Sequence, residues 1–195
     1  MYFEPNVIYH IYNQGNNRQR IFFNDENYLF FIKKMREFLL PHAEILCYCL
    51  MPNHFHWLVF VREVRVAHSV GVTSSHADTP MRPLNDSIGI LLRSYTRAIN
   101  KQENRIGALF REKTKAKDGW ESPFVAPGHP DYCKIWKQWD IYGITCLNYI
   151  HNNPVRAGLV HHADDWLYSS SQDFSGKRKG SLCNQALARE LLALP

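Results

Sequence analysis

The chain has 195 residues and a mass of 22.8 kDa, which predicts one domain large enough for a hydrophobic core. Its apolar runs are too short to cross a membrane. The five cysteines are scattered and odd in number, and residues 1–5 lack a signal-peptide pattern. A disulfide-stapled or membrane protein is therefore not expected, and the reducing cytoplasm is the expected location.

The first half of the chain predicts three strands and a helix. Residues 7–12 alternate β-branched and aromatic side chains, as a strand does, and residues 13–17 have turn composition. Asp25 is the expected cap of a helix over 26–40. The core-facing residues of this helix are expected to be Tyr28, Phe31, Ile32, Met35 and Leu39. Strands over 43–50 and 54–61, with Pro52 and Asn53 between them, predict an antiparallel hairpin.

The second half alternates irregular and helical segments. Residues 62–86 and 118–140 have the composition of irregular segments. Between them we expect a helix over 88–102, capped by Asp86 or Ser87, and a strand over 108–116. A last helix covers 141–152, and Pro154 is expected to end it. This order predicts an α+β fold, with one domain over 1–175 and a C-terminal tail over 176–195.

Two histidines begin the third predicted strand, in the segment Met-Pro-Asn-His-Phe-His-Trp-Leu-Val-Phe of residues 51–60. Side chains two apart on a strand point to the same face, so His54 and His56 should project side by side. Two imidazoles on a rigid element suit a divalent metal site. Two histidines on the same face of an apolar strand are also unusual, because each needs a hydrogen bond when it is buried. The alternative is that backbone groups or water satisfy each histidine.

Basic residues are concentrated in one stretch of the chain. The net charge is +5, and residues 91–117 hold eight basic side chains against two acidic ones. Arg93, Arg97 and Lys101 are four apart and share one face of the predicted helix. The opposite, core face is expected to hold Ile88, Leu92, Tyr95 and Ile99. The basic residues that share one face of the predicted strand are Arg111, Lys113, Lys115 and Lys117. This pattern predicts a polyanionic partner, with a solvated helix face as the alternative.

Tyr149 and Asn153 are four residues apart in the last predicted helix, so they lie one turn apart on one face. A tyrosine hydroxyl is a weak nucleophile near neutral pH, and it becomes useful in phosphoryl transfer when a metal polarises the phosphate. An asparagine carbonyl oxygen can be a third metal ligand beside two imidazoles. Without a further observation, a core tyrosine and a helix-capping asparagine are the simpler interpretations.

The two motifs together resemble those of the single-tyrosine HUH transposases, and within them the REP-associated branch. The motifs are Leu-Met-Pro-Asn-His-Phe-His at 50–56 and Leu-Asn-Tyr-Ile-His-Asn-Asn-Pro-Val-Arg-Ala-Gly at 147–158. Supporting stretches at 9–18, 93–97 and 166–171 follow in the family's order. A lone His-x-His is a weak signal, but His-x-His followed by Tyr-Ile-x-x-Asn-Pro-Val-x-x-Gly is a strong one.

The resemblance implies a metal-dependent single-stranded DNA endonuclease or transposase that acts on hairpin-containing DNA. Tyr149 would be the nucleophile that forms a 5′-phosphotyrosine, and His54, His56 and Asn153 would bind Mg²⁺ or Mn²⁺. The implied fold is a ferredoxin-like antiparallel sheet with helices packed on it. The DNA-contacting residues would be Arg18, Arg93, Arg97, Lys101, Arg111, Lys113 and Lys115. The expected location is the bacterial cytoplasm, on the nucleoid when DNA is bound, as a monomer or a homodimer.

Other interpretations of the same residues stay open. Tyr95 is the rival nucleophile, although its helical phase favours core packing. Cys47 and Cys49 could join the two histidines in a zinc site, but structural zinc sites usually use wider cysteine spacings. A descendant that binds a DNA hairpin without cutting it is the alternative function, because phosphate contacts supply affinity without chemistry. A metal-dependent phosphoesterase without a covalent step is a further one.

Overall fold

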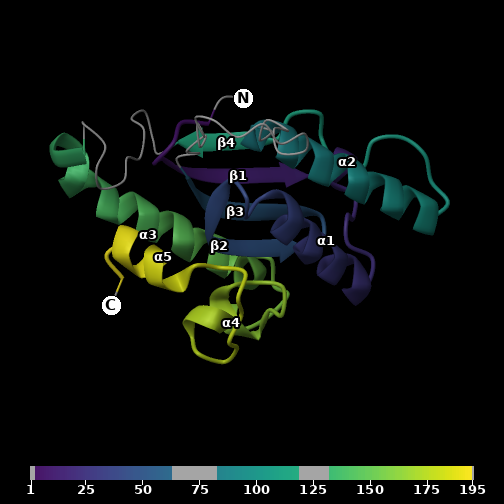
Figure 1. Ribbon diagram of the computed structural model, residues 1–195. Coiled ribbons are helices and arrows are strands. Elements are labelled where there is room, and N and C mark those ends of the chain that lie inside the picture. Colours follow the sequence, from purple (N-terminus) through teal and green to yellow (C-terminus); the bar gives the residue numbers. More distant parts are fainter. Residues whose placement is uncertain (1–2, 63–82, 119–131, 195) are drawn as a thin grey trace, which may run out of the picture.

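The computed structural model describes residues 3–62, 83–118 and 132–194. Its elements are β1 (Ile8–Gln14), the 3₁₀ helix η1 (Asn16–Arg18), α1 (Asp25–Phe38), β2 (Ala43–Met51), β3 (His54–Val61), α2 (Leu84–Gln102), β4 (Lys115–Asp118), α3 (Tyr132–Arg156), η2 (Ala163–Asp165), α4 (Ser171–Phe174) and α5 (Gln185–Leu191). The strands form one antiparallel sheet in the order β2-β3-β1-β4 (Figure 1). This strand order, with α1 and α2 as crossovers, is the ferredoxin-like arrangement, so the predicted α+β fold is confirmed.

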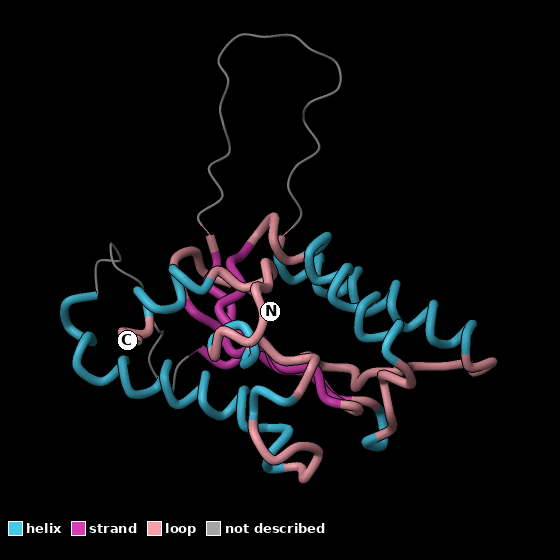
Figure 2. Tube along the Cα trace, turned by 90° about the horizontal axis from the view of Figure 1, so that it is seen from below, coloured by secondary structure: helices cyan, strands magenta, loops and turns pink. Residues whose placement is uncertain are grey.

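Helices cover both faces of the sheet, and in Figure 2 the strands run between helices on their two sides. On one face α1 and α2 pack on the sheet through a core that includes Phe31, Trp57 and Tyr95. On the other face α3 and α5 pack through Ile150 and Ala188. Because side chains alternate along β1 to β3, apolar residues supply both cores. No helix in the described ranges is long and apolar enough to cross a membrane.

The strands and the hairpin follow the prediction closely, whereas the helix starts differ. β2 and β3 pair from Ala43 with Val61 to Met51 with His54. The cap of α1 is Asn24, not Asp25: Asn24 has extended backbone angles, and its side-chain oxygen accepts a hydrogen bond of 3.0 Å from the Asn27 amide. Asp25 already lies in the first helical turn, where its charge favours the helix N-terminus.

Helix α2 begins at Leu84, four residues before the predicted start, with Pro83 as the capping residue. Residues 84–86 were therefore wrongly assigned to an irregular segment, of which 63–82 lie outside the described residues. Leu84 is buried, and this apolar contact adds a turn to the helix. Asp86 and Ser87 are not caps, because both lie inside the helix, and the buried Ser87 hydroxyl lies 2.9 Å from Nε2 of His42. The predicted core face is confirmed, since Ile88, Leu92, Tyr95 and Ile99 are all buried.

The predicted strand over 108–116 is wrong in extent. Only Lys115–Asp118 forms β4, which pairs with β1. The segment 108–114 instead runs beside the end of β1. Phe110 makes an isolated bridge with Gly15, and the Arg111 amide donates to the Gln14 carbonyl at 2.9 Å. Lys115 and Lys117 still share a strand face, but Arg111 and Lys113 lie in this extended connection.

Helix α3 is longer than predicted at both ends. It begins at Tyr132, so residues 132–140 are helical, while 119–131 lie outside the described residues. Pro154 does not end it: the helix continues to Arg156, and the Ala157 amide still bonds the Asn153 carbonyl at 3.0 Å. A proline in the last turn removes one donor and leaves the bonds on either side. The chain turns away at Gly158, which has a φ of +67°.

The predicted C-terminal tail, 176–195, packs against the sheet as far as residue 194. Leu182 and Cys183 belong to the core under α1 and α2. The Asn184 amide donates to the Ile45 carbonyl at 2.9 Å, and the Asn184 side chain caps α5. Helix α5 then contributes Ala188 to the core that it shares with α3. In Figure 1, α5 lies beside α3.

Candidate functional site: a histidine pair facing a tyrosine

The two motif histidines and the motif tyrosine meet at one small cavity of about 190 Å³. His54 and His56 reach it from β3, and Tyr149 reaches it from α3. The other side chains that line it are Tyr12, Asn13, Gln14, Arg111, Lys113 and Lys115. Side chains of β1 line the same cavity because β1 pairs with β3, with Tyr12 opposite His56 and Gln14 opposite His54. The cavity is thus a cluster of imidazoles and phenols with three cations at its rim.

The two histidines are each held through the Nδ1 atom of the ring. Their ring centroids are 5.1 Å apart. Nδ1 of His54 lies 2.6 Å from the side-chain oxygen Oδ1 of Asn53, and Nδ1 of His56 lies 2.9 Å from Nε2 of His10. Each ring is therefore oriented through Nδ1, as metal-binding histidines are oriented by outer partners. Nε2 of His56 has no hydrogen-bond partner among the described residues, whereas His54 also makes a side-chain hydrogen bond with Asn153.

Burial keeps this imidazole cluster neutral. It lowers the pKa of His56 to about 2, with His10 and His54 adding to the effect. It also lowers the pKa of His10 to about 4, and nearby Lys117 lowers it further. The pKa of His54 is lowered by burial too, although a hydrogen bond with Asn153 acts in the opposite direction. Neutral imidazoles are the form that binds metal ions.

Tyr149 is held near the histidines but remains accessible. Its side chain is 38% exposed, and its ring centroid is 5.4 Å from that of His56 in an edge-to-face arrangement. The guanidinium of Arg156 lies 5.4 Å from the Tyr149 ring centroid, from two turns further along α3. A partly open phenol between imidazoles and a cation can reach a phosphate that enters the cavity.

Asn153 joins the cluster from one turn beyond Tyr149. It is buried, and its Nδ2 donates to the Tyr149 carbonyl at 3.0 Å, which leaves its Oδ1 as an acceptor. Its hydrogen bond with His54 places it at the histidine pair. Two imidazole nitrogens and one carboxamide oxygen form a mixed donor set, which suits Mn²⁺ and also allows Mg²⁺ with further water ligands. The residues present therefore fit such an ion.

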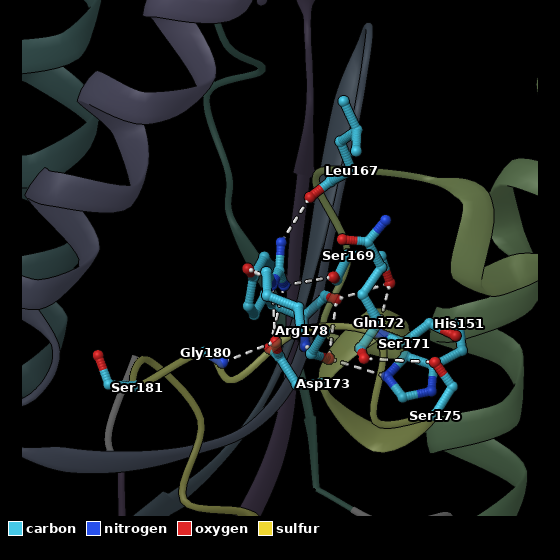
Figure 3. A network of polar contacts seen from close by, with 12 residues as sticks. His151, Leu167, Ser169, Ser171, Gln172, Asp173, Ser175, Arg178, Gly180 and Ser181 are labelled. Atoms are coloured by element: carbon cyan, nitrogen blue, oxygen red, sulfur yellow. Dashed lines mark hydrogen bonds and ion pairs between the residues drawn. The ribbon is translucent and has the colours of Figure 1, made fainter.

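The opposite side of α3 is anchored to the sheet, two residues after Tyr149. Nε2 of His151 lies 2.8 Å from the Ser170 hydroxyl, which also contacts the backbone of Tyr48 on β2. Burial lowers the pKa of His151 to about 4. Figure 3 shows how Arg178 completes this network: it pairs with the buried Asp173 at 2.6 Å and donates to the Leu167 and Ser169 carbonyls. The network fixes the segment 166–180 against β2, and thereby the side of α3 that faces away from the cavity.

The predicted DNA-contacting residues fall into two sets. Arg111 and Lys113 line the cavity, and together with Arg93 and Arg97 they also line a larger neighbouring groove. Lys115 lines the cavity alone. Lys101 and Arg18 are exposed, but neither is among the lining residues of these two hollows. Arg18 lies beside the site, since its carbonyl accepts from Asn53 at 3.3 Å.

The two rival interpretations of the site residues receive little support. Tyr95 is fully buried, and its hydroxyl donates to the Ile21 carbonyl at 2.7 Å, so its predicted core role is confirmed. Burial raises its pKa above the usual tyrosine value. Across the described ranges, no group of three or more histidine, cysteine or acidic side chains could hold a metal ion. The suggested zinc site of Cys47 and Cys49 with the histidines is therefore not formed.

Among the site residues that were not identified from the sequence, three contact His56 or Tyr149. His10 contacts His56, Tyr12 has its ring centroid 5.6 Å from that of His56, and Arg156 lies over Tyr149. His10 and Tyr12 are two apart on β1, and this same-face spacing was visible in the predicted strand. The pairing of β1 with β3 was not visible there, so nothing linked the two strands.

Comparisons with known proteins identify a fold relative. No protein-family model matches the chain, and no curated protein matches it. Among solved structures, a REP-associated tyrosine transposase bound to a REP hairpin is similar, with a TM-score of 0.52 and 15% sequence identity. The similarity covers 91% of this chain and 84% of that one. The two proteins share a fold. At this identity the likeness concerns the fold alone, and the chemistry depends on the residues described above.

Proposed function

We propose that this protein is a metal-dependent endonuclease for single-stranded DNA, of the transposase type, with Tyr149 as its nucleophile. One observation carries the proposal: Tyr149, on α3, lies with His54 and His56, on β3, around one cavity whose rim holds Arg111, Lys113 and Lys115. Residues nearly a hundred positions apart in the sequence converge there as a nucleophile, a donor set and a cationic rim. The shared fold with a hairpin-bound transposase supports the same conclusion.

In the proposed reaction, the Tyr149 hydroxyl oxygen attacks a backbone phosphorus. The bond from phosphorus to the 3′ oxygen breaks, the tyrosine proton is released, and the leaving oxygen takes up a proton to become a 3′-hydroxyl. The product is a 5′-phosphotyrosine on the protein. Arg156 lies over the Tyr149 ring, where its charge favours the developing phenolate. The rim cations hold the phosphate backbone and lower its repulsion of the nucleophile.

His54, His56 and Asn153 would hold the Mg²⁺ or Mn²⁺ ion in this proposal. When bound, such an ion supplies charge neutralisation at a non-bridging phosphate oxygen. His10 and Asn53 keep the two imidazoles oriented through their Nδ1 atoms. The anchor of His151 on Ser170 holds α3 so that Tyr149 stays over the same cavity.

The test is covalent capture of DNA. The protein is mixed with a hairpin oligonucleotide that carries single-stranded flanks and a 3′ label, with Mn²⁺ present, and is then resolved under denaturing conditions. We expect a labelled protein band of increased mass, lost in Tyr149→Phe and lost when EDTA replaces Mn²⁺. A hairpin is the first substrate to use because the fold relative was solved with one.

Each alternative function predicts a different result in the same assay. A binder without catalysis retains the oligonucleotide under native conditions but yields no cleavage. A phosphoesterase yields labelled fragments without attached protein. Labelled adducts that persist in Tyr149→Phe would show that another residue is the nucleophile.

A further inference from the structure

The leaving oxygen of the proposed reaction needs a proton donor. The 3′ oxygen departs as an alkoxide, which is a poor leaving group, and a positioned acid speeds such a step by about 10²–10⁴-fold. In an in-line displacement, the attacking and leaving oxygens lie on opposite sides of phosphorus. Tyr149 lines the cavity from α3, so the donor should lie on the opposite wall of the cavity.

That opposite wall is made by β1, β3 and β4 and by the connection that precedes β4. Most of its side chains cannot act as acids. His54 and His56 are the proposed metal ligands, amide side chains do not give up a proton, and an arginine stays protonated in proteins. Among the lining residues in the described part of the chain, the remaining acids are Tyr12, Lys113 and Lys115.

Of these three side chains, Tyr12 is the one that packing holds in place. It is half-buried, and its ring centroid lies 5.1 Å from that of His10 and 5.6 Å from that of His56. No described residue hydrogen-bonds its hydroxyl, which is therefore available to a ligand. Lys113 and Lys115 are exposed, and their ammonium groups are strongly hydrated on flexible stems. Because an acid must lie within hydrogen-bond reach of the oxygen that it protonates, this difference favours Tyr12.

Tyr12 also stands between a proposed metal ligand and a cation in one row across the sheet. It lies opposite His56 of β3 on one side and opposite Lys115 of β4 on the other. Residues directly opposite each other in antiparallel strands project to the same face, with Cβ atoms about 4.5–5.5 Å apart. A positive charge so close to the phenol favours the phenolate that remains once the proton has been given away.

The two phenols of the cavity approach the same pair of imidazoles from different elements and in different orientations. Tyr149, from α3, is edge-on, with interplanar angles of 69° to His10 and 84° to His56. Tyr12, from β1, is tilted by only 34° and 33° to the same rings. One phenol thus reaches a bound phosphate from the helix and the other from the sheet, as attack and departure on opposite sides of phosphorus require.

We propose that Tyr12 is the acid that protonates the 3′ oxygen as it leaves, and that Lys115 stabilises the phenolate that remains. The inference rests on the proposed function, because it assigns a further catalytic residue to that reaction. The Tyr149 oxygen forms its bond to phosphorus, the bond from phosphorus to the 3′ oxygen breaks, and the Tyr12 hydroxyl proton passes to that oxygen. A phenol is a stronger acid than a sugar hydroxyl, so the transfer to the alkoxide is favourable. When the strand is rejoined, the Tyr12 phenolate takes the proton back from the 3′-hydroxyl.

The experiment replaces the leaving oxygen by sulfur. The bond that the wild type cuts in the hairpin oligonucleotide is mapped first, and the oligonucleotide is then made with either oxygen or sulfur as the 3′ bridging atom of that bond. A thiolate leaves without a proton, so the sulfur substrate does not need the acid. The rate of adduct formation in a single turnover with Mn²⁺ is measured on both substrates.

The matched control for Tyr12→Phe is Tyr9→Phe. Tyr9 lies on the same strand but on the opposite face, in the core under α1 and α2, where its hydroxyl accepts from the Glu4 amide at 3.0 Å. Tyr12→Phe should form adducts about 100-fold or more slowly than the wild type on the oxygen substrate, yet within a few-fold of the wild type on the sulfur substrate. Tyr9→Phe should match the wild type on both substrates.

Two further measurements separate the acid from a structural role. Phenylalanine keeps the ring that packs on His10 and His56, so thermal unfolding and DNA affinity in EDTA should be the same in Tyr12→Phe and the wild type. Lys115→Gln should slow the oxygen substrate more than the sulfur substrate. A lysine that only contacts DNA would slow both substrates equally, and that result would overturn its proposed role.

The assignment of Tyr12 is wrong if Tyr12→Phe cuts the oxygen substrate as fast as the wild type, or if both substrates are slowed equally. Adducts that persist in Tyr149→Phe and disappear in Tyr12→Phe would make Tyr12 the nucleophile instead. Failure of the nuclease proposal gives a separate result. In that case the wild type forms no adduct with either substrate, and the assignment of Tyr12 falls with the proposal.

Discussion

Removing the His10 side chain tests whether the imidazole pair is oriented for a metal ion. For Nε2 of His56 to bind an ion, Nδ1 of His56 must carry the ring proton and donate a hydrogen bond to Nε2 of His10, 2.9 Å away. His10→Leu keeps a similar apolar volume but removes the acceptor. Both rings are buried, so no bulk water replaces the lost partner.

The expected size of the effect follows from this burial. A buried N–H group without a partner costs about 1–3 kcal/mol. Loss of an outer partner of a metal-binding histidine typically lowers metal affinity by about 10–100-fold, which is about 1.4–2.7 kcal/mol. His10→Leu should therefore bind Mn²⁺ about 10–100-fold more weakly than the wild type. His10→Gln, which retains a side-chain oxygen as acceptor, should recover part of the affinity.

The assay is titration of Mn²⁺ into DNA-free protein, with free Mn²⁺ followed by electron paramagnetic resonance and thermal unfolding recorded in parallel. His42→Leu is the matched control, because His42 is equally buried and bonds Ser87. It precedes Ala43, at the end of the β2–β3 pair away from His54, one of the proposed metal ligands. The variant should lose stability without losing Mn²⁺ affinity. The reasoning fails if folded His10→Leu binds Mn²⁺ as tightly as the wild type, or if His42→Leu is equally impaired.

Three further outcomes are expected. Tyr95→Phe should lower the free energy of unfolding by about 1–3 kcal/mol in urea titrations, because the buried Ile21 carbonyl loses its donor. The variant should still form covalent adducts. Unchanged stability together with lost adducts would contradict this prediction. A mixture of His56→Ala and Tyr149→Phe proteins should form no adducts on a denaturing gel, because both residues line the cavity of one chain; recovered activity would require exchange between two chains. The pKa of His151 is about 4, so the unfolded chain takes up a proton first as the pH falls from about 6.5. The free energy of unfolding should thus decrease by up to about 3 kcal/mol towards about pH 4. His151→Gln should lose less stability than the wild type between about pH 7 and about pH 4.5, as measured by urea titrations at the two pH values.

Much of the fold was predictable from local patterns. The unbroken apolar run after Pro52 and Asn53 defined the limits of β3, and the short connection between the strands predicted its hairpin with β2. Helix limits were less accurate because they depend on tertiary contacts. Leu84 extends α2 since its side chain is buried, and α3 continues past Pro154 to Arg156, where the next amide still bonds the Asn153 carbonyl. The strand predicted over 108–116 is short because only part of it finds a partner in β1.

The sequence by itself determined which functional groups the site contains and which of them share a strand or helix face. His-x-His on a strand places two imidazoles on one face, and the spacing of Tyr149 and Asn153 places them on one helix face, because both periodicities are local properties of the backbone. Only the tertiary structure decided that these two faces meet, since strand pairing and helix packing join residues far apart in sequence. It also decided that His10 contacts His56, because this contact does not exist until β1 pairs with β3.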